Sequence, residues 1–408
     1  MKKVLFLTYV YPYGYYNASA ACSTRIMKEL ALDSNIEVHC VSYKQGVADK
    51  QPYSTIPNVT LHPISLREKK RMSRFFIHLQ ILLRIPIYPI FSFRRIWNHY
   101  ESCKKICQKE HFDLIISQCY PEESVIVGAM LKKSNIIDRH VAIFWDNIYG
   151  KKPARVIPLR FAQRRQKKLE SFIAKYADSL VSLYPLKKFH ELNGDLIAAA
   201  GKRTYLGIPS IIRPEFPIET SYMSVVKEGM INVLYSGTII KPKFISNLID
   251  ILNCSKFAEK INLIFFSKGV SNDEFDKLRD KFKGTIQSPG YIPVVELLSV
   301  YRQVDAFISF PGDVYSICSK CYEYMSYGHP MIVLYNDPDD VNVSTFSEYP
   351  LCQTICIEEL EVENAKIFDR FIETNLGKSI PFETVESLFI SDTPKAYTNL
   401  IKNICYAD

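Results

Sequence analysis

A strand, a loop and a short helix in the second half of the chain combine residue types that suit a phosphorylated ligand. Ser319 and Gly328 favour the start and the end of this helix, and the free N–H groups at its start attract phosphate. Glu323 lies one turn further on, and its carboxylate can point back to the same pocket and accept hydrogen bonds from ribose hydroxyls. Alternatively, Lys320 and Glu323 form an ordinary surface ion pair.

Two lysines follow the strand that opens the second half of the chain. This strand is expected at residues 231–236, and Gly237 and Thr238 come directly after it. Lys241 and Lys243 follow, near the strand end where α/β sheets place ligands, and cations there can offset negative charge on a bound group. The alternative is that both lysines are solvated loop charges.

The first half offers one acidic candidate and one loop. Asp146 follows a predicted strand, where it can orient a hydroxyl group or stabilise a cationic transition state, or else simply cap a turn. Gly14 is the lone glycine of the first strand–helix loop, so the three-glycine dinucleotide fingerprint is absent and an NAD-dependent enzyme is disfavoured. Asn17 and the small residues after it allow a ligand close to the backbone, or pack in a turn.

The elements that must position these residues alternate regularly between strands and helices. Buried strands are predicted from apolar, β-branched runs at residues 4–10, 36–42, 113–117, 141–145, 179–183, 231–236, 261–266, 305–310 and 331–335. This rhythm predicts an α/β protein with two Rossmann-like, doubly wound domains that face a cleft. We place them at residues 1–210 and 211–385, with a helix over 386–408 that returns to the first domain.

Composition supports a folded chain in a reducing compartment. The 408 residues are enough for two domains, and the formal charge of +8 favours anionic partners, without any nucleic-acid-binding signature. The odd number of cysteines and the lack of a signal peptide predict reduced thiols and a cytoplasmic protein. A zinc site built from the pairs Cys318/Cys321 and Cys352/Cys356 is disfavoured, because no histidine lies at ligand spacing. We expect no metal site.

Residues 71–96 break the regular alternation. An apolar, aromatic run here has basic residues at both ends, and Arg84, Pro86 and Pro89 interrupt it before it can span a membrane. The segment is predicted either to dock on a membrane surface at the inner face or to form a core helix with basic ends.

The motif Ser319-Lys-x-x-Glu323-Tyr-Met-x-x-Gly328-x-Pro330 resembles the donor site of the large, mainly retaining group of glycosyltransferases called family 4. The resemblance extends to residues 235–238, to the loop that ends at Gly269 and to residues 289–293, and more weakly to residues 11–21. This family has the GT-B fold. Members of the family often carry a second acid eight residues before the ribose glutamate, where this chain has Tyr315.

The resemblance implies a role for each matching residue. Glu323 would hold the ribose, backbone groups around Ser319 the diphosphate, and Tyr291 and Ile292 the base. Lys241 and Lys243 would meet the donor phosphates, and we favour Lys243 for stabilising the leaving group.

The implied activity is sugar transfer from a UDP- or GDP-sugar, without a metal or other cofactor, to an acceptor hydroxyl. We expect the acceptor to be a glycan or a lipid-linked intermediate of a surface polysaccharide, such as capsule or lipopolysaccharide. The alternatives are a nucleotide-sugar epimerase and a GT-B-like scaffold without catalytic activity.

Overall fold

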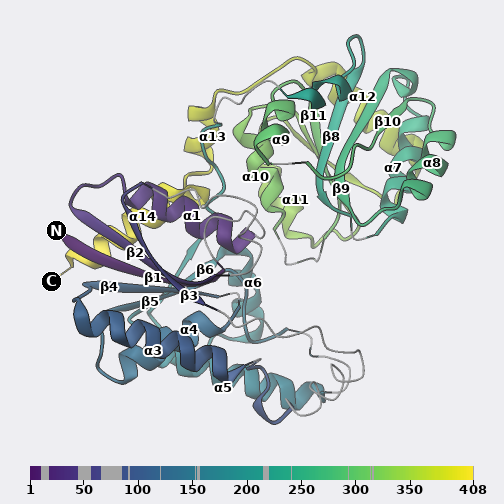
Figure 1. Ribbon diagram of the computed structural model, residues 1–408. Helices are drawn as coiled ribbons and strands as arrows, with labels where there is room; N and C mark the ends of the chain where they lie inside the picture. The colour runs from purple at the N-terminus through teal and green to yellow at the C-terminus, as the bar shows by residue number, and fades with distance from the viewer. Residues whose placement is uncertain are drawn as a thin grey trace. The chain divides into compact units, whose positions relative to one another are not determined.

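The chain folds into two compact units in the computed structural model (Figure 1). Unit 1 comprises Met1–Pro209 and Pro394–Asp408, and unit 2 comprises Ser210–Thr393. The structure describes residues 1–10, 18–44, 57–65, 85–90, 92–119, 121–151, 153, 157–214, 220–239, 241–292, 294–312, 314 and 317–407.

Unit 1 contains a seven-stranded parallel sheet in the order β3-β2-β1-β4-β5-β6-β7. Its strands are β1 (Lys2–Val10), β2 (Ile36–Lys44), β3 (Val59–Ser65), β4 (Leu114–Cys119), β5 (His140–Phe144), β6 (Ser179–Leu183) and β7 (Arg203–Leu206). β4 and β5 are buried along their whole length because helices cover both faces of the sheet. The order reverses between β1 and β4, which makes this a doubly wound sheet.

Helices cover the two faces of the unit 1 sheet. α1 (Ala18–Leu30) and α14 (Pro394–Tyr406) pack together on one face, and α3 (Phe93–Lys109), α4 (Glu123–Lys133) and α5 (Leu159–Tyr176) lie side by side on the other (Figure 1). α6 (Tyr184–Asn193) joins β6 to β7. Among the described residues, no helix is both long and apolar enough to span a bilayer.

Unit 2 contains a six-stranded parallel sheet in the order β10-β9-β8-β11-β12-β13, which again reverses beside its first strand. The strands are β8 (Ile231–Thr238), β9 (Ile261–Lys268), β10 (Thr285–Gln287), β11 (Ala306–Ser309), β12 (Met331–Tyr335) and β13 (Cys352–Cys356). The helices are α7 (Lys243–Asn253), α8 (Asn272–Lys281), α9 (Val294–Tyr301), α10 (Ser319–Ser326), α11 (Val341–Phe346), α12 (Glu361–Asn375) and α13 (Phe382–Leu388). The prediction of two Rossmann-like units is therefore confirmed.

The end of the chain differs from the single helix expected there. α13 still belongs to unit 2, where Phe389 contacts Tyr322 of α10 and the carbonyl of Asp392 accepts the N–H groups of Ser210 and Ile211 at 2.9 and 3.0 Å. α14 alone packs in unit 1, where Lys402 forms an ion pair with Asp33 at 2.7 Å. The change of unit falls at Thr393/Pro394, eight residues after the predicted start of the return at 386.

Candidate active site

The carboxyl ends of β8 and β11 form the topological switch point of the unit 2 sheet. Doubly wound sheets bind ligands at this position, because the two crossovers leave the sheet toward opposite faces. β8 ends with Ser236, Gly237 and Thr238, and the loop after β11 leads into α10. The topology therefore brings these predicted donor residues to one edge of one sheet.

α10 is anchored to the end of β8 by a buried tyrosine cluster. The Tyr324 hydroxyl accepts a hydrogen bond from the Ser236 N–H at 2.9 Å, and the Ser236 hydroxyl is hydrogen-bonded to Tyr301. Tyr324 also stacks on Phe307 of β11 with a centroid distance of 4.2 Å. Because Glu323 precedes Tyr324, these contacts determine where its carboxylate lies.

Glu323 and Lys320 form an ion pair on the first turns of α10. The Lys320 Nζ lies 2.8 Å from Glu323 Oε2, and the Glu323 side chain is 18% exposed. The carboxylate thus remains accessible at the switch point, and a ligand hydroxyl can compete with the lysine for it. The i,i+3 spacing alone predicts such an ion pair. The geometry is therefore compatible both with a Glu323 that holds a ribose and with an ordinary surface ion pair.

The start of α10 differs from the sequence expectation by one residue. Cys318 is the N-cap, with extended backbone angles, and Ser319 is the first helical residue. The Cys318 N–H donates to Asn342 Oδ1 at 2.8 Å, so the first turn of α11 holds the loop before α10. Ser319 thereby presents its backbone N–H, rather than a capping side chain, at the helix start.

Two predicted donor glycines have a structural reason to be glycine. Gly237 has φ 149°, and Gly269 has φ 99°. A Cβ on Gly269 would lie 2.6 Å from the carbonyl oxygen of Ile239, whose own N–H donates to Lys268 at 2.9 Å. Close approach between two backbone segments therefore accounts for Gly269 without any ligand.

The loop at Gly269 lies beside the second predicted base-side segment. The Lys268 ammonium is 3.9 Å from the centroid of the Tyr291 ring, a cation–π contact. Tyr291 is exposed, whereas Ile292 is buried. Tyr291 can therefore offer a surface to an aromatic base, and Ile292 supports the segment from the core.

The two lysines after β8 differ in their environment. Lys243 begins α7, and its Nζ lies 3.4 Å from Glu358 Oε1, an exposed ion pair that links α7 to the segment after β13. Lys241 lies above the Phe244 ring at 5.1 Å and has no carboxylate partner among the described residues. Lys241 is thus a cation that a diphosphate can recruit without displacing a carboxylate.

Asp146 lies in unit 1, just beyond the carboxyl end of β5. Its side chain is 62% exposed, and its Oδ2 lies 3.8 Å from Lys151 Nζ. The carboxylate is therefore free to contact a ligand. Gly14 and Asn17 lie outside the described residues, as do Tyr315 and residues 71–84 and 91 of the predicted docking segment.

A buried acid close to Asp146 was not identified from the sequence. Glu122 is the N-cap of α4 and is only 4% exposed, and its Oε2 has no hydrogen-bond partner among the described residues. Burial raises the pKa of Glu122 to about 7, opposed in part by the charge of Lys151. The sequence does contain a signal for this acid. Glu122 follows β4 as Asp146 follows β5, so both acids lie at the same edge of the sheet.

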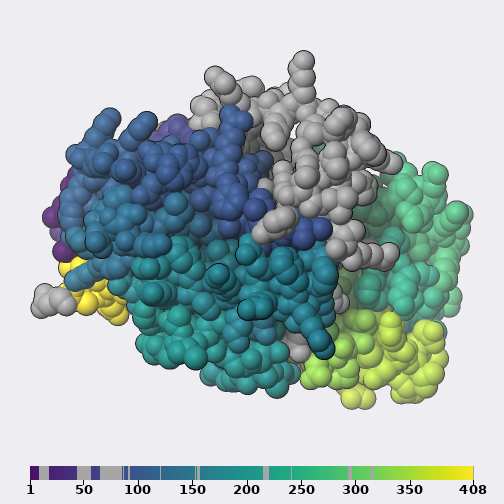
Figure 2. All heavy atoms as spheres, turned by 90° about the horizontal axis from the view of Figure 1, so that it is seen from below, coloured from purple at the N-terminus to yellow at the C-terminus, as the bar shows by residue number. Residues whose placement is uncertain are grey.

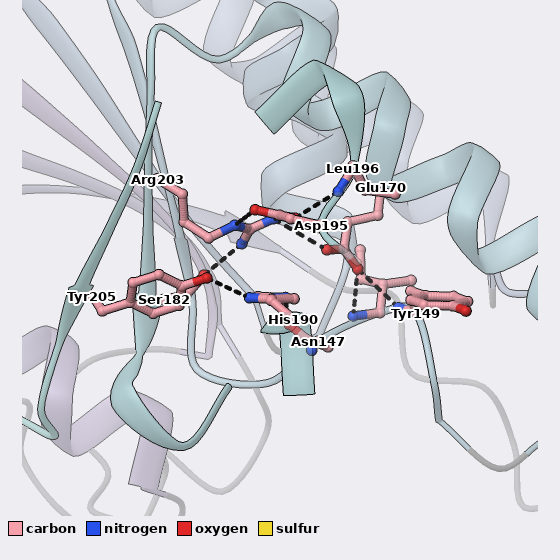
Figure 3. Close-up of polar contacts among 10 residues, drawn as sticks. Asn147, Tyr149, Glu170, Ser182, His190, Asp195, Leu196, Arg203 and Tyr205 are labelled. Atoms are coloured by element: carbon pink, nitrogen blue, oxygen red, sulfur yellow. Dashed lines mark hydrogen bonds and ion pairs between the residues drawn. The ribbon is translucent and has the colours of Figure 1, made fainter. Parts of the chain in front are cut away.

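The loop after β5 is held by a buried polar network (Figure 3). Glu170 of α5 accepts the N–H groups of Ile148 and Tyr149 at 3.1 and 2.8 Å, and the Arg203 guanidinium lies 3.5 Å from the same carboxylate. His190 is hydrogen-bonded to Asn147 at 3.2 Å. These contacts fix the backbone that carries Asp146.

One group of metal-ligating side chains occurs in the described part of unit 1. Glu37, His39 and Glu110 place possible ligand atoms within 4.8 Å of one another. The Lys3 ammonium bonds Glu110 and lies 3.2 Å from Glu37, so a cation already neutralises both carboxylates. We assign no metal to this group.

The helices α3 and α5 begin with exposed aromatic and basic residues. Phe93 and Trp97 of α3 are 55% and 56% exposed, and they border an apolar hollow of about 460 Å³. Arg94 and Arg160 lie in the first turns of α3 and α5, where the helix dipole disfavours cations. α4 lies between α3 and α5, and in Figure 2 the blue and teal atoms of this part of the chain form one face of unit 1.

The fold is that of the GT-B glycosyltransferases. A sucrose-phosphate synthase from Thermosynechococcus elongatus has a TM-score of 0.66 at 14% identity, with 99% of this chain and 98% of that chain covered. Anabaena Alr3699/HepE, solved with UDP and glucose, has a TM-score of 0.54 at 12% identity, with 99% and 97% covered.

WaaG, a glycosyltransferase involved in lipopolysaccharide biosynthesis, has a TM-score of 0.56 at 12% identity, with 98% of this chain and 99% of that chain covered. No family model and no curated protein matches the sequence. At these identities the similarity establishes the architecture of the whole chain, and the role of each site residue depends on the geometry described above.

Proposed function

We propose that this protein is a glycosyltransferase that moves a sugar from a nucleoside-diphosphate sugar to an acceptor hydroxyl. The observation that carries the proposal is the accessible Glu323 carboxylate on the first turns of α10, at the switch point of the unit 2 sheet. A carboxylate near a helix N-terminus suits a ribose beside a diphosphate, since it accepts hydroxyls while backbone N–H groups and Lys241 meet the phosphates.

Uracil is the base that we propose, and UDP the leaving nucleotide. The exposed Tyr291 ring and the Lys268 loop offer a stacking surface and a cation at the base side. The similar Anabaena structure was solved with UDP and glucose, which supports the choice of nucleotide.

In the proposed reaction, the bond between the anomeric carbon and the β-phosphate oxygen breaks and a bond to the acceptor oxygen forms. The charge that develops on UDP is stabilised by Lys241, by Lys243 when it leaves Glu358, and by the N–H groups at the start of α10, without a metal ion. Asp146 of unit 1 is our candidate for orienting the acceptor hydroxyl, whose proton is lost to solvent. We propose retention of anomeric configuration from the resemblance alone.

A lipid-linked acceptor at the inner face of a membrane fits the exposed surface of α3 and α5. Aromatic side chains beside arginines are typical of segments that rest on anionic lipid headgroups. Charge reversal of Arg94 and Arg95 to glutamate should reduce sedimentation with phosphatidylglycerol liposomes. The same reversal of Lys366 and Arg370 in unit 2 is the control, and unchanged sedimentation of the Arg94/Arg95 variant would remove the membrane from the proposal.

The donor site is tested by saturation-transfer NMR against UDP, GDP, CMP and NAD. We expect selective binding of UDP that is lost in Glu323→Ala. Glu363→Ala is a matched control, because Glu363 forms an i,i+3 pair with Lys366 at the same 2.8 Å but on the exposed surface of α12. Equal binding by both variants would refute the donor site.

Turnover separates the proposed enzyme from the alternatives. Release of UDP that depends on an added acceptor identifies a transferase. Binding of UDP without any turnover over a panel of acceptors would favour a GT-B-like scaffold.

A further inference from the structure

Two cysteines flank the residues that begin α10. Cys318 is the N-cap, with φ −75° and ψ 97°, and Cys321 lies in the first helical turn with its N–H donating to the Cys318 carbonyl at 3.0 Å. Ser319 and Lys320 lie between them, so the segment is a C-x-x-C sequence at a helix N-terminus. This is the arrangement in which thiol–disulfide exchange occurs in α/β proteins.

The two thiols are electrostatically different. The pKa of Cys318 is lowered, chiefly because the Cys321 thiol donates a hydrogen bond to it, and further by nearby backbone amides and the Lys320 charge, although burial opposes this. The pKa of Cys321 is raised by its complete burial and by the neighbouring Cys318 sulfur. Cys318 is part-exposed. Cys318 is thus suited to attack a disulfide in solution. Cys321 is suited to attack the mixed disulfide that Cys318 then carries.

The other close cysteine pairs do not share this geometry. Cys103 and Cys107 both lie inside α3, where helical geometry holds Cβ atoms three or four residues apart at about 5–6 Å, beyond the roughly 3.5–4.5 Å of a disulfide, whereas Cys318 stands outside its helix with extended backbone angles. Burial raises the pKa of Cys107 to about 11. Cys352 and Cys356 end the strand β13, so their Cα atoms are about 13 Å apart.

We propose that Cys318 and Cys321 form a reversible intramolecular disulfide, with a low-molecular-weight disulfide such as oxidised glutathione as the oxidant. The Cys318 thiolate attacks one sulfur of the oxidant, forms a mixed disulfide and releases one thiolate. Cys321 then loses its proton and attacks Cys318, and the second glutathione leaves. Overall, two cysteine thiols are oxidised and one disulfide is reduced to two thiols.

Oxidation of this pair is coupled to the donor site, a step that rests on the proposed function. A diphosphate at the start of α10 adds negative charge beside Cys318 and disfavours its thiolate, so bound UDP slows oxidation. Closing the bridge also displaces the N-cap backbone next to the N–H groups that would meet the diphosphate, so we expect the disulfide to weaken UDP binding and, by thermodynamic reciprocity, bound UDP to disfavour the disulfide. We expect a loss of about tenfold in affinity, the change that removal of one hydrogen bond to a charged group produces.

The disulfide is tested by exposing the full-length protein to defined ratios of oxidised and reduced glutathione, followed by alkylation and tryptic mass mapping. Trypsin cleaves after Lys320, so a bridge appears as two linked peptides that are lighter by two hydrogen atoms than the separate ones. We expect this product in the wild type and in the control Cys107→Ser. Cys321→Ser should accumulate glutathione on Cys318, and Cys318→Ser should leave Cys321 unmodified.

The outcomes separate this inference from the proposed function. Absence of both the linked peptides and the Cys318 adduct would overturn the disulfide. A disulfide that leaves UDP affinity unchanged in the same preparation would overturn the coupling. Failure of the reduced protein to bind UDP would instead refute the proposed donor site, while the peptide map still decides whether the disulfide forms.

Discussion

Replacing Glu122 with glutamine tests whether a carboxyl group is buried without a partner at the sheet edge of unit 1. Burial raises the pKa of Glu122 from 4.5 to about 7, so the folded protein binds the proton more tightly than the unfolded chain does. A raised pKa on an acid means that stability falls as the pH rises from 4.5 through 7, since ionisation is then more favourable in the unfolded chain.

The size of the effect follows from this separation of pKa values. At 1.36 kcal/mol per pKa unit, the ionised carboxylate costs about 3 kcal/mol of folding free energy above pH 7, and most of this cost, about 2.5 kcal/mol, develops between pH 5 and pH 8. Glu122→Gln removes the charge while keeping the shape, so its stability relative to the wild type should rise by about this amount over the same interval.

Urea unfolding followed by tryptophan fluorescence isolates the relevant unit. The chain has two tryptophans, Trp97 and Trp145, and both lie in unit 1. The free energies of unfolding of the wild type and Glu122→Gln are compared at each pH, so that the contributions of the other titrating groups cancel. Glu191→Gln is the control, because Glu191 is an exposed partner of Lys187 in the same unit. If the free energies of unfolding of the wild type and Glu122→Gln changed in parallel with pH, that result would refute the buried, unpartnered carboxyl group.

Two further experiments test the packing, one in each unit. Arg203→Ala leaves Glu170 buried without its cation, since both side chains are at most 3% exposed, and should destabilise unit 1 by about 3–5 kcal/mol in the same fluorescence assay; a loss below 1 kcal/mol would contradict the ion pair. Gly328 and Gly377 both have φ 75°, so Gly328→Ala and Gly377→Ala meet the same backbone strain. Only at Gly328 would the added Cβ also lie 2.1 Å from a backbone oxygen, the carbonyl oxygen of Ile380. Both should lose about 1–2 kcal/mol of backbone stability, and Gly328→Ala clearly more, as measured by urea unfolding followed by circular dichroism. Equal losses would contradict the close approach.

Most of the sheet strands are visible in the sequence because they are buried on both faces. Runs such as residues 261–266 are apolar without interruption, so a local pattern is enough to recognise them. β3, β7 and β13 are not visible in this way, since the edge strands are only part-buried and carry polar residues or proline. The helix α3 was also missed, because its charged face dominates its composition.

The same distinction applies to the candidate site. The spacing of Ser319, Lys320 and Glu323 within one helix depends only on local geometry, and the structure keeps these residues together on α10. The sequence reasoning favoured Lys243 over Lys241, but the ion pair of Lys243 involves Glu358, which lies 115 residues away and is brought close only by folding. That contact is exposed and weak, so Lys241 and Lys243 both stay candidates for the phosphates.

The architecture can be predicted from the amino-acid sequence, because the hydrophobic pattern of each strand and helix is a local property that does not depend on the partner elements. Which charged groups can bind or react depends instead on the tertiary structure. The pKa of Glu122, the asymmetry of Cys318 and Cys321 and the network around Arg203 all arise from desolvation and from partners that are placed by the fold. Burial and electrostatic contact are properties of position in space, and linear spacing does not encode them.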